Sequence, residues 1–147
     1  MISAGIKRRQ ALIVPLFLCF AFAGEKIAIV TKIVGKAEYV RKKEPPKDLK
    51  RGFVIESGDE ILTKRDAFVA LVFIDDRSAL KKRERSQIVI NGKKSAKKIS
   101  KKIDLNNGII RAQVNSNRDF LVQTSVSVAS VKGTDFWVIS DEKTGDS

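Results

Sequence analysis

Residues 67–74 read AFVALVFI, eight consecutive apolar residues that decide the class of fold. Valine, isoleucine and phenylalanine favour extended strands, and the run is shorter than most helices. The polar turn residues Asp75-Asp76-Arg77-Ser78 follow it immediately. We therefore predict a strand at Ala67–Ile74 that lies in the centre of a sheet and is buried on both faces.

The rest of the chain also shows a period of two residues. Short apolar or alternating runs are separated by Gly, Pro, Asn, Asp or Ser, and no window has the period of an amphipathic helix. The predicted strands are Lys26–Val34, Ala37–Val40, Gly52–Glu56, Glu60–Thr63, Gln87–Ile90, Ile103–Leu105, Ile109–Val114, Phe120–Gln123, Val126–Val131 and Asp135–Ile139. About ten short strands predict a single all-β domain, a sandwich or roll with mostly antiparallel pairing, and we find no internal repeat.

Three connections carry recognisable turn signals. Asn91-Gly92 is the strongest hairpin signal, because both residues tolerate the left-handed backbone of a type I′ turn, and Asn106-Asn107-Gly108 is a second one. Pro45-Pro46 predicts a loop that includes Lys47-Asp48, since proline donates no hydrogen bond to a strand ladder.

The first 23 residues have the composition of a secretory signal peptide. A positive segment, Lys7-Arg8-Arg9, precedes the apolar stretch Ala11–Phe22, and Ala21-Phe22-Ala23 fits a cleavage site. The apolar stretch spans about 18 Å as a helix, short of the bilayer hydrocarbon core of about 30 Å, and contains Pro15, so an uncleaved membrane anchor is the weaker alternative. We expect removal of residues 1–23, an exported domain over residues 24–147 without a stable transmembrane segment, and a periplasmic or cell-surface location.

Composition narrows the chemistry of this domain. The chain has no histidine, which excludes histidine-based triads and most catalytic zinc sites, and its single cysteine, Cys19, lies in the leader. Any enzyme of this composition would depend on carboxylates, Lys or Ser. We predict no catalytic residue, no metal site and no cofactor. Asp75 and Asp76 form an adjacent pair of carboxylates, but neighbouring side chains in a turn point apart, which disfavours an acid–base pair.

Basic residues dominate the chain, with 29 Lys and Arg against 17 Asp and Glu and a net charge of +12. Removal of the leader leaves a net charge of +9. Between Lys81 and Lys102 stand ten basic residues and one acidic residue, Glu84. A hairpin at Asn91-Gly92 would present six of them as a surface for a polyanion or partner: Lys93, Lys94, Lys97, Lys98, Lys101 and Lys102.

Candidate ligands for this surface are a protein partner, an anionic envelope polymer or lipid head groups. Nucleic acid is disfavoured, because export separates the protein from it and no aromatic residue is interleaved with the lysines. The alternative, of equal weight, is that the lysines only keep a sheet edge from pairing with other strands.

Several motifs resemble those of FecR-type periplasmic domains. The similarity rests on Gly58-Asp59-Glu60-Ile61-Leu62-Thr63, on Ala70–Phe73 followed by Asp75–Leu80, and on Phe120–Thr124 with Val131–Val138. It extends over about Val34–Ile139, and the ordered combination is more specific than any single motif.

The motif residues have physical roles of their own. Gly58-Asp59 fits a tight turn in which the aspartate accepts backbone N–H groups, and Gly133-Thr134 fits a bulge, so both pairs are interpreted as structural. Phe136 and Trp137 point to opposite faces of their strand, which places one in the core and the other on the surface. Trp137 is a candidate aromatic contact for a ligand, against the alternative of simple packing.

The chain departs from the FecR pattern at three places. Arg77 and Lys64 stand where family members commonly have glycine, and Arg77 would be strained by a positive φ. Family members usually continue after Val131–Val138 with further hairpins, so we expect an incomplete last sheet edge. The six residues before Lys7 are too few for the cytoplasmic anti-sigma segment of the regulatory members, so the resemblance does not carry over their iron-signalling role.

These observations leave two classes of function. The favoured one is an exported, non-enzymatic, FecR-like binding or signalling module of the bacterial envelope that engages a protein or an anionic polymer. The alternative is a carboxylate-based hydrolase of an envelope glycan, which needs two carboxylates about 5 to 9.5 Å apart across a cleft. A structural or assembly domain differs from the first class only in whether a partner alters its state.

Overall fold

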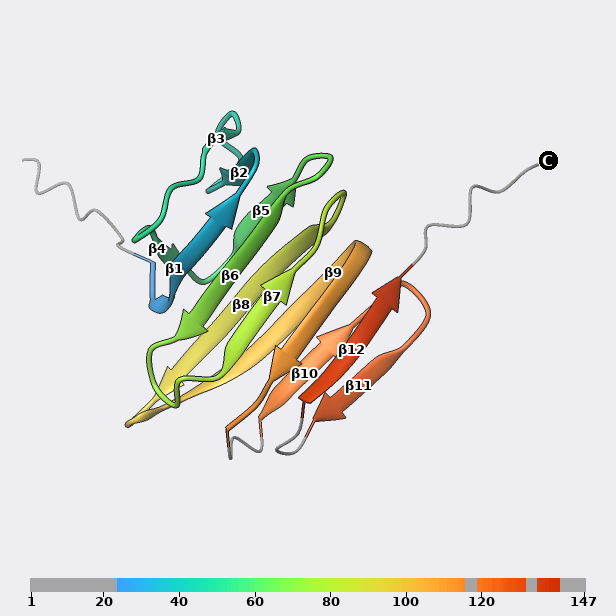
Figure 1. Ribbon diagram of the computed structural model, residues 1–147. Coiled ribbons are helices and arrows are strands. Elements are labelled where there is room, and N and C mark those ends of the chain that lie inside the picture. Colours follow the sequence, from blue (N-terminus) through green and yellow to red (C-terminus); the bar gives the residue numbers. More distant parts are fainter. Residues whose placement is uncertain (1–23, 116–118, 132–134, 141–147) are drawn as a thin grey trace, which may run out of the picture.

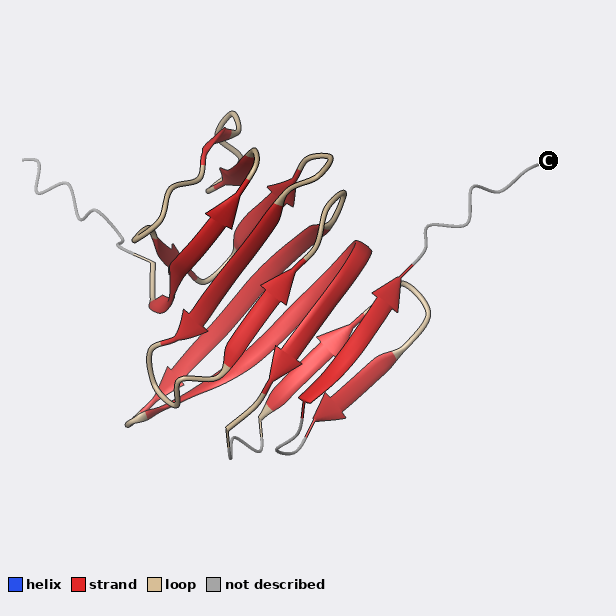
Figure 2. Ribbon diagram, viewed as in Figure 1, coloured by secondary structure: helices blue, strands red, loops and turns tan. Residues whose placement is uncertain are grey.

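The computed structural model describes residues 24–115, 119–131 and 135–140. These residues form strands and contain no helix (Figure 1, Figure 2). The strands are β1 (Lys26–Val34), β2 (Ala37–Val40), β3 (Lys47–Asp48), β4 (Val54–Glu56), β5 (Asp59–Thr63), β6 (Phe68–Phe73), β7 (Ala79–Lys82), β8 (Gln87–Ser95), β9 (Lys98–Gln113), β10 (Phe120–Gln123), β11 (Val128–Val131) and β12 (Asp135–Ser140). The predicted signal peptide, residues 1–23, lies outside the described residues.

The strands form one continuous sheet that folds over into two layers (Figure 1). The path through the sheet is β3-β2-β5-β8-β9-β7-β6-β1-β4. Strand β9 joins the layers, because its first part pairs with β8 and β10 and its last part pairs with β7 and β12. We call β1, β4, β6, β7, β12 and the end of β9 the front layer, and the remaining strands with the start of β9 the back layer.

Pairing in the sheet is antiparallel throughout the described strands, except between β9 and β10. Strand β10 runs parallel to β9 because the chain leaves the front layer at the end of β9 and re-enters the back layer beside the start of the same strand. The prediction of an all-β, mostly antiparallel sandwich or roll is therefore confirmed.

Apolar side chains from both layers fill the space between them. Phe73 of β6 and Phe120 of β10 meet edge to face, with ring centroids 5.8 Å apart. Both rings are fully buried. Such a pair adds about 0.5–1.5 kcal/mol to what burial of the two rings contributes, so it ties the front layer to the back layer.

The run that predicted the fold forms β6, which pairs with β1 on one side and β7 on the other. Val69, Leu71 and Phe73 point into the core and are at most 1% exposed, while the alternate residues of the strand are only half-buried. The central position is as predicted, but the prediction of burial on both faces is wrong. A sheet folded around one core has one inner face, and its outer face meets solvent.

Neither asparagine–glycine segment forms a hairpin turn. Strand β8 continues through Asn91-Gly92, and the chain reverses at Ala96, whose φ is +53°. Strand β9 likewise runs through Asn106–Gly108 without interruption. A Cβ atom at Gly108 would clash with the hydroxyl group of Ser86. Glycine is therefore required there by close packing as the strand passes between the layers.

Two further predictions concern turns. Lys47 and Asp48 pair with β2, so the prediction of a loop there is wrong, because their N–H groups lie beyond Pro45-Pro46 and are able to bond. Arg77 has a φ of +58°, which confirms the left-handed, strained backbone expected where family members have glycine.

Candidate functional site

Four exposed lysines stand at the end of the β8–β9 hairpin, and we call them the basic tip. Lys93 and Lys94 belong to β8, Lys97 to the turn and Lys98 to β9. None of the four forms an ion pair within the described residues, although the backbone N–H of Lys94 donates to the carboxylate of Glu25 at 2.9 Å. The tip is therefore a concentrated positive charge that faces solvent.

Lys101, which was predicted to join this surface, is fully buried. Its Nζ lies 2.9 Å from Asp75 Oδ1 and 3.0 Å from Asp76 Oδ2, two carboxylates of the β6–β7 turn. The prediction of an exposed Lys101 is wrong, and so is the expectation that the two aspartates point apart. Their convergence on one ammonium group offsets part of the cost of burying these charges.

Lys82 is the second basic residue that the fold removes from the surface. Lys82 is fully buried, and its Nζ donates a hydrogen bond to the carbonyl oxygen of Ile61 on β5. Burial lowers the pKa of Lys82 to about 6, and the nearby carboxylate of Glu60 opposes this shift. At neutral pH the amine is therefore mostly uncharged.

A signal for both buried lysines exists in the sequence. Lys101 lies between Ile99 and Ile103 at a spacing of two, and Lys82 lies two residues after Leu80. Alternate residues of a strand share a face, so each lysine belongs to an apolar face by position. For these two residues the period of the strand, and not the charge of the side chain, indicates the burial that the structure shows.

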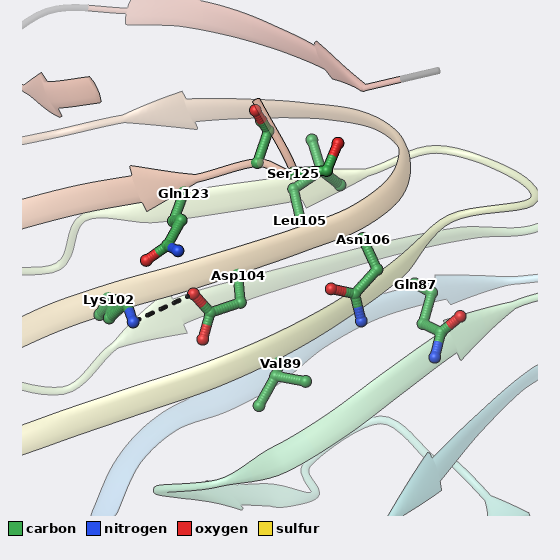
Figure 3. Close-up of a pocket in the computed structure, with 9 residues that line it drawn as sticks. Gln87, Val89, Lys102, Asp104, Leu105, Asn106, Gln123 and Ser125 are labelled. Carbon is green, nitrogen blue, oxygen red and sulfur yellow. Dashed lines mark ion pairs between the residues drawn. The ribbon is translucent and has the colours of Figure 1, made fainter. Parts of the chain in front are cut away.

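An open groove of about 700 Å³ crosses β8, β9 and β10 in the back layer (Figure 3). Most of its lining side chains are polar: Gln87, Val89, Lys102, Asp104, Leu105, Asn106, Gln123, Thr124 and Ser125. A second hollow, lined in part by Lys93 and Ser100, shares Lys102 with the groove. The outer face of the back layer is thus polar and hollowed from the basic tip to the β10–β11 turn.

Some polar groups of the groove are already engaged. Asp104 accepts a hydrogen bond from Asn91 Nδ2 at 2.9 Å and lies 3.4 Å from Lys102 Nζ, as Figure 3 shows for the ion pair. The side chains of Asn106 and Gln123 make no hydrogen bond within the described residues. Asp104 is the one carboxylate among the lining residues, so the groove lacks the pair that the predicted glycan hydrolase requires.

The Gly58-Asp59 motif builds a buried charged corner. Asp59 is 1% exposed and accepts the Glu56 N–H at 2.8 Å, as expected for a capping turn, and Gly58 has a φ of +90°. The same carboxylate accepts Arg41 Nε and Nη2 at 2.8 and 2.7 Å, which raises the pKa of Arg41. These contacts support the structural interpretation, and Arg41 is a partner that no sequence motif indicated.

Phe136 and Trp137 occupy opposite faces of β12, as predicted. Phe136 packs against the core, with its ring centroid 6.2 Å from that of Phe120. Trp137 is 50% exposed, and the guanidinium groups of Arg83 and Arg111 lie 5.0 and 5.2 Å from its ring. Its role as a ligand contact stays a prediction. Gly133 and Thr134 lie outside the described residues.

The described residues contain neither a cluster of metal ligands nor a membrane-spanning helix. No three His, Cys, Asp or Glu side chains gather there in a way that would hold a metal ion. Within the same residues, no helix has the length and apolar character needed to span a bilayer.

Comparison with known proteins gives one match. A family model described as "FecR protein" matches residues 59–146, more than half of the chain, and this range contains the groove, the basic tip and Trp137. Searches of the curated proteins and of the solved structures found no match.

Proposed function

This chain belongs to the FecR protein family, as its motifs predicted, and from that premise we propose that it is an exported, non-enzymatic binding or signalling module of the bacterial envelope. Residues 1–23 are its secretory leader and residues 24–147 its functional domain. Membership of the family supports a signalling or regulatory role outside the cytoplasm.

The basic tip is the site through which the module engages its partner. The observation that carries this proposal is the gathering of Lys93, Lys94, Lys97 and Lys98 at one exposed hairpin end without ion-pair partners among the described residues. Like charges held together repel one another, and an approaching polyanion relieves this repulsion. The partner is therefore an acidic protein surface or an anionic envelope polymer, including lipid head groups.

A non-enzymatic role agrees with the groove, because a glycosidase mechanism needs two carboxylates and the groove has Asp104 alone. Asp75 and Asp76 both pair with the ammonium group of Lys101, which engages them in a structural contact. No observation favours the hydrolase.

The proposal is tested by pull-down from an envelope extract with the exported domain, at low and at high salt. The variant reverses the tip with K93E, K94E, K97E and K98E, and the matched control reverses four exposed lysines elsewhere, K26E, K32E, K43E and K50E. Screening shortens the reach of charge from about 10 Å at 0.1 M salt to about 3 Å at 1 M, so we expect partners to disappear at high salt and with the tip variant, and to remain with the control. Identical partners in all samples would overturn the proposal.

A further inference from the structure

The β8–β9 hairpin projects at the end of the fold that carries the basic tip. In Figure 1 its turn reaches past the β6–β7 turn at the same end of the sheet. Ile88 and Ile90 of β8 are buried in the core, and Lys94 follows on the same face of the strand. Its cross-strand neighbour is Ile99, which is 1% exposed. The inner face of the hairpin therefore changes from apolar to cationic at its far end.

The end of this hairpin and the β6–β7 turn line a common hollow of about 290 Å³. Its lining residues are Ile74, Asp75, Lys94, Ala96, Lys97 and Ile99. Ile74, on the side of the front layer, is 45% exposed, and the two lysines on the hairpin side are exposed as well. The hollow thus combines an aliphatic side chain with two ammonium groups.

Asp75 fixes the β6–β7 turn against the hairpin. Its carboxylate accepts hydrogen bonds from the backbone N–H of Ile99 and from Lys101 Nζ, both at 2.9 Å. Both donors belong to the start of β9, next to the basic tip. Ile74, the residue before Asp75, is therefore held beside the tip, and the two form one surface.

The positive charge of this surface is not balanced by its nearest carboxylates. The Asp75 side chain is 5% exposed and pairs with the buried Lys101. Glu25 accepts the backbone N–H of Lys94 and not its ammonium group. Among the described residues, the four lysines of the basic tip have no ion-pair partner. This end of the fold therefore presents unbalanced positive charge next to an exposed aliphatic residue.

We propose that the basic tip and Ile74 together dock the protein onto a membrane surface that contains anionic phospholipids. This inference rests on the proposed function and deepens it, because it names what the tip engages. The lysines contact lipid phosphates, while Ile74 and the methyl group of Ala96 enter between the outer ends of the acyl chains. Attachment to a membrane surface depends on both contributions, buried apolar area and attraction to anionic lipids.

Three features favour a lipid surface over an acidic protein. All four cations of the tip are lysines, which act as point charges toward phosphate, whereas arginine suits the planar, bidentate pairing of carboxylates. Lysine stems are apolar and lie along an apolar surface while the ammonium group stays in water. The hairpin end projects from the fold, so a flat surface reaches it without meeting the neighbouring strands (Figure 1).

The first test measures binding of residues 24–147, which contain every described strand, to lipid vesicles. The vesicles are phosphatidylcholine alone or phosphatidylcholine mixed with phosphatidylglycerol, and polyphosphate is the anion without acyl chains. Each lysine near an anionic surface contributes about fivefold to affinity. We expect binding to the mixed vesicles only, and a loss of at least about a hundredfold when K93E, K94E, K97E and K98E are combined. Absence of binding to the mixed vesicles would overturn the proposal in favour of an acidic protein, and equal binding to both kinds of vesicle would overturn it as well.

The second test separates the apolar contact from the charge. Ile74→Ser removes the aliphatic side chain, and the matched control is Val34→Ser, a residue that is 48% exposed and pairs with Phe68 at the other end of β6. We expect I74S to bind mixed vesicles about fivefold more weakly than V34S does, and both variants to bind polyphosphate as the natural protein does. Equal vesicle affinities of the two variants would refute the membrane contact. The proposed function fails separately, if reversal of the tip leaves binding to polyphosphate unchanged.

A third variant reports directly on the surroundings of position 74. Ile74→Trp keeps an apolar side chain that is suited to the membrane interface. Trp137 is the single tryptophan of the natural chain, so the natural protein supplies the background emission. We expect the added emission to shift to shorter wavelength with mixed vesicles and to stay in place with polyphosphate. An unshifted emission from vesicle-bound protein would show that position 74 stays in water and would contradict the proposal.

Discussion

Two fully buried lysines, Lys101 and Lys82, have different contacts within the same core. Lys101 lies within 3.0 Å of two carboxylates that the β6–β7 turn supplies. Lys82 meets the carbonyl oxygen of Ile61, and its pKa falls to about 6. The first region keeps charge inside the fold by pairing it, and the second removes the charge by giving up a proton.

The difference follows from the groups that surround the Nζ atom of each lysine. Moving an ammonium group out of water is costly, and only a nearby opposite charge or the loss of the proton reduces that cost. Lys101 ties the β6–β7 turn to β9 through charge, whereas Lys82 ties the front layer to β5 through a hydrogen bond. The two contacts should therefore respond differently to substitution and to pH.

The largest effect is expected from Lys101→Met. Removal of the ammonium group leaves the buried carboxylates of Asp75 and Asp76 facing each other, which costs about 3–5 kcal/mol of the free energy of unfolding. Urea denaturation followed by circular dichroism measures this loss. The control is Lys102→Met on the same strand, where the side chain is 47% exposed and the expected change is below about 0.5 kcal/mol. Similar losses for both variants would contradict the comparison.

The next effect is a dependence of stability on pH that Lys82 causes. Between about pH 6 and its usual pKa of 10.5, the lysine is protonated in the unfolded chain and neutral in the folded one. The unfolded state binds more protons in this window, so the free energy of unfolding rises with pH, by up to about 1.4 kcal/mol per pH unit. The chain has no histidine to obscure this slope.

Denaturation curves from pH 6 to pH 9 measure the slope in the natural protein and in Lys82→Met. Methionine has no proton to lose, so we expect the slope to flatten. Lys81→Met, the exposed neighbour, should keep it. If the free energy of unfolding of the natural protein did not change between pH 6 and pH 9, Lys82 would have to remain charged in the folded state.

The smallest effect is expected from Asp76→Asn. Burial alone would raise the pKa of Asp76, but the Ser78 N–H and the Lys101 ammonium outweigh it and lower the pKa below its usual value. The folded carboxylate thus stabilises the protein above its unfolded pKa, and this contribution disappears as the pH falls through the lowered one. Asparagine keeps the acceptor for Ser78, so the loss at neutral pH should be about 1–2 kcal/mol.

Denaturation curves at decreasing pH measure the loss of the Asp76 contribution in acid. The variant D76N should lose less stability than the natural protein as the solution is acidified below about pH 4. The control is Asp66→Asn at an exposed carboxylate. Parallel acid profiles for D76N and the natural protein would assign the acid sensitivity to another group.

Much of the fold was predictable because strand periodicity is local. The run at Ala67–Ile74 gave a central strand, and Phe120–Gln123 was predicted with the bounds that the structure has. The failures at Asn91-Gly92 and Asn106–Gly108 share one cause: these residues permit a turn, but ladder partners on neighbouring strands kept the chain extended. A hairpin signal describes what the backbone tolerates, not what its neighbours require.

The site was predictable only in part. Lys93, Lys94, Lys97 and Lys98 are exposed as expected from their charge, while Lys101 is not, because Asp75 and Asp76 lie far from it in sequence and next to it in space. The groove depends on which strands lie side by side. No local pattern contains that information.

The sequence by itself determined the class of fold, the family and the excess of positive charge, since all three depend on the order and kind of residues along the chain. The tertiary structure decided which lysines meet water, which meet carboxylates and which lose a proton. The reason is that the energy of a charge depends on the groups around it, and folding sets those groups by bringing distant segments together.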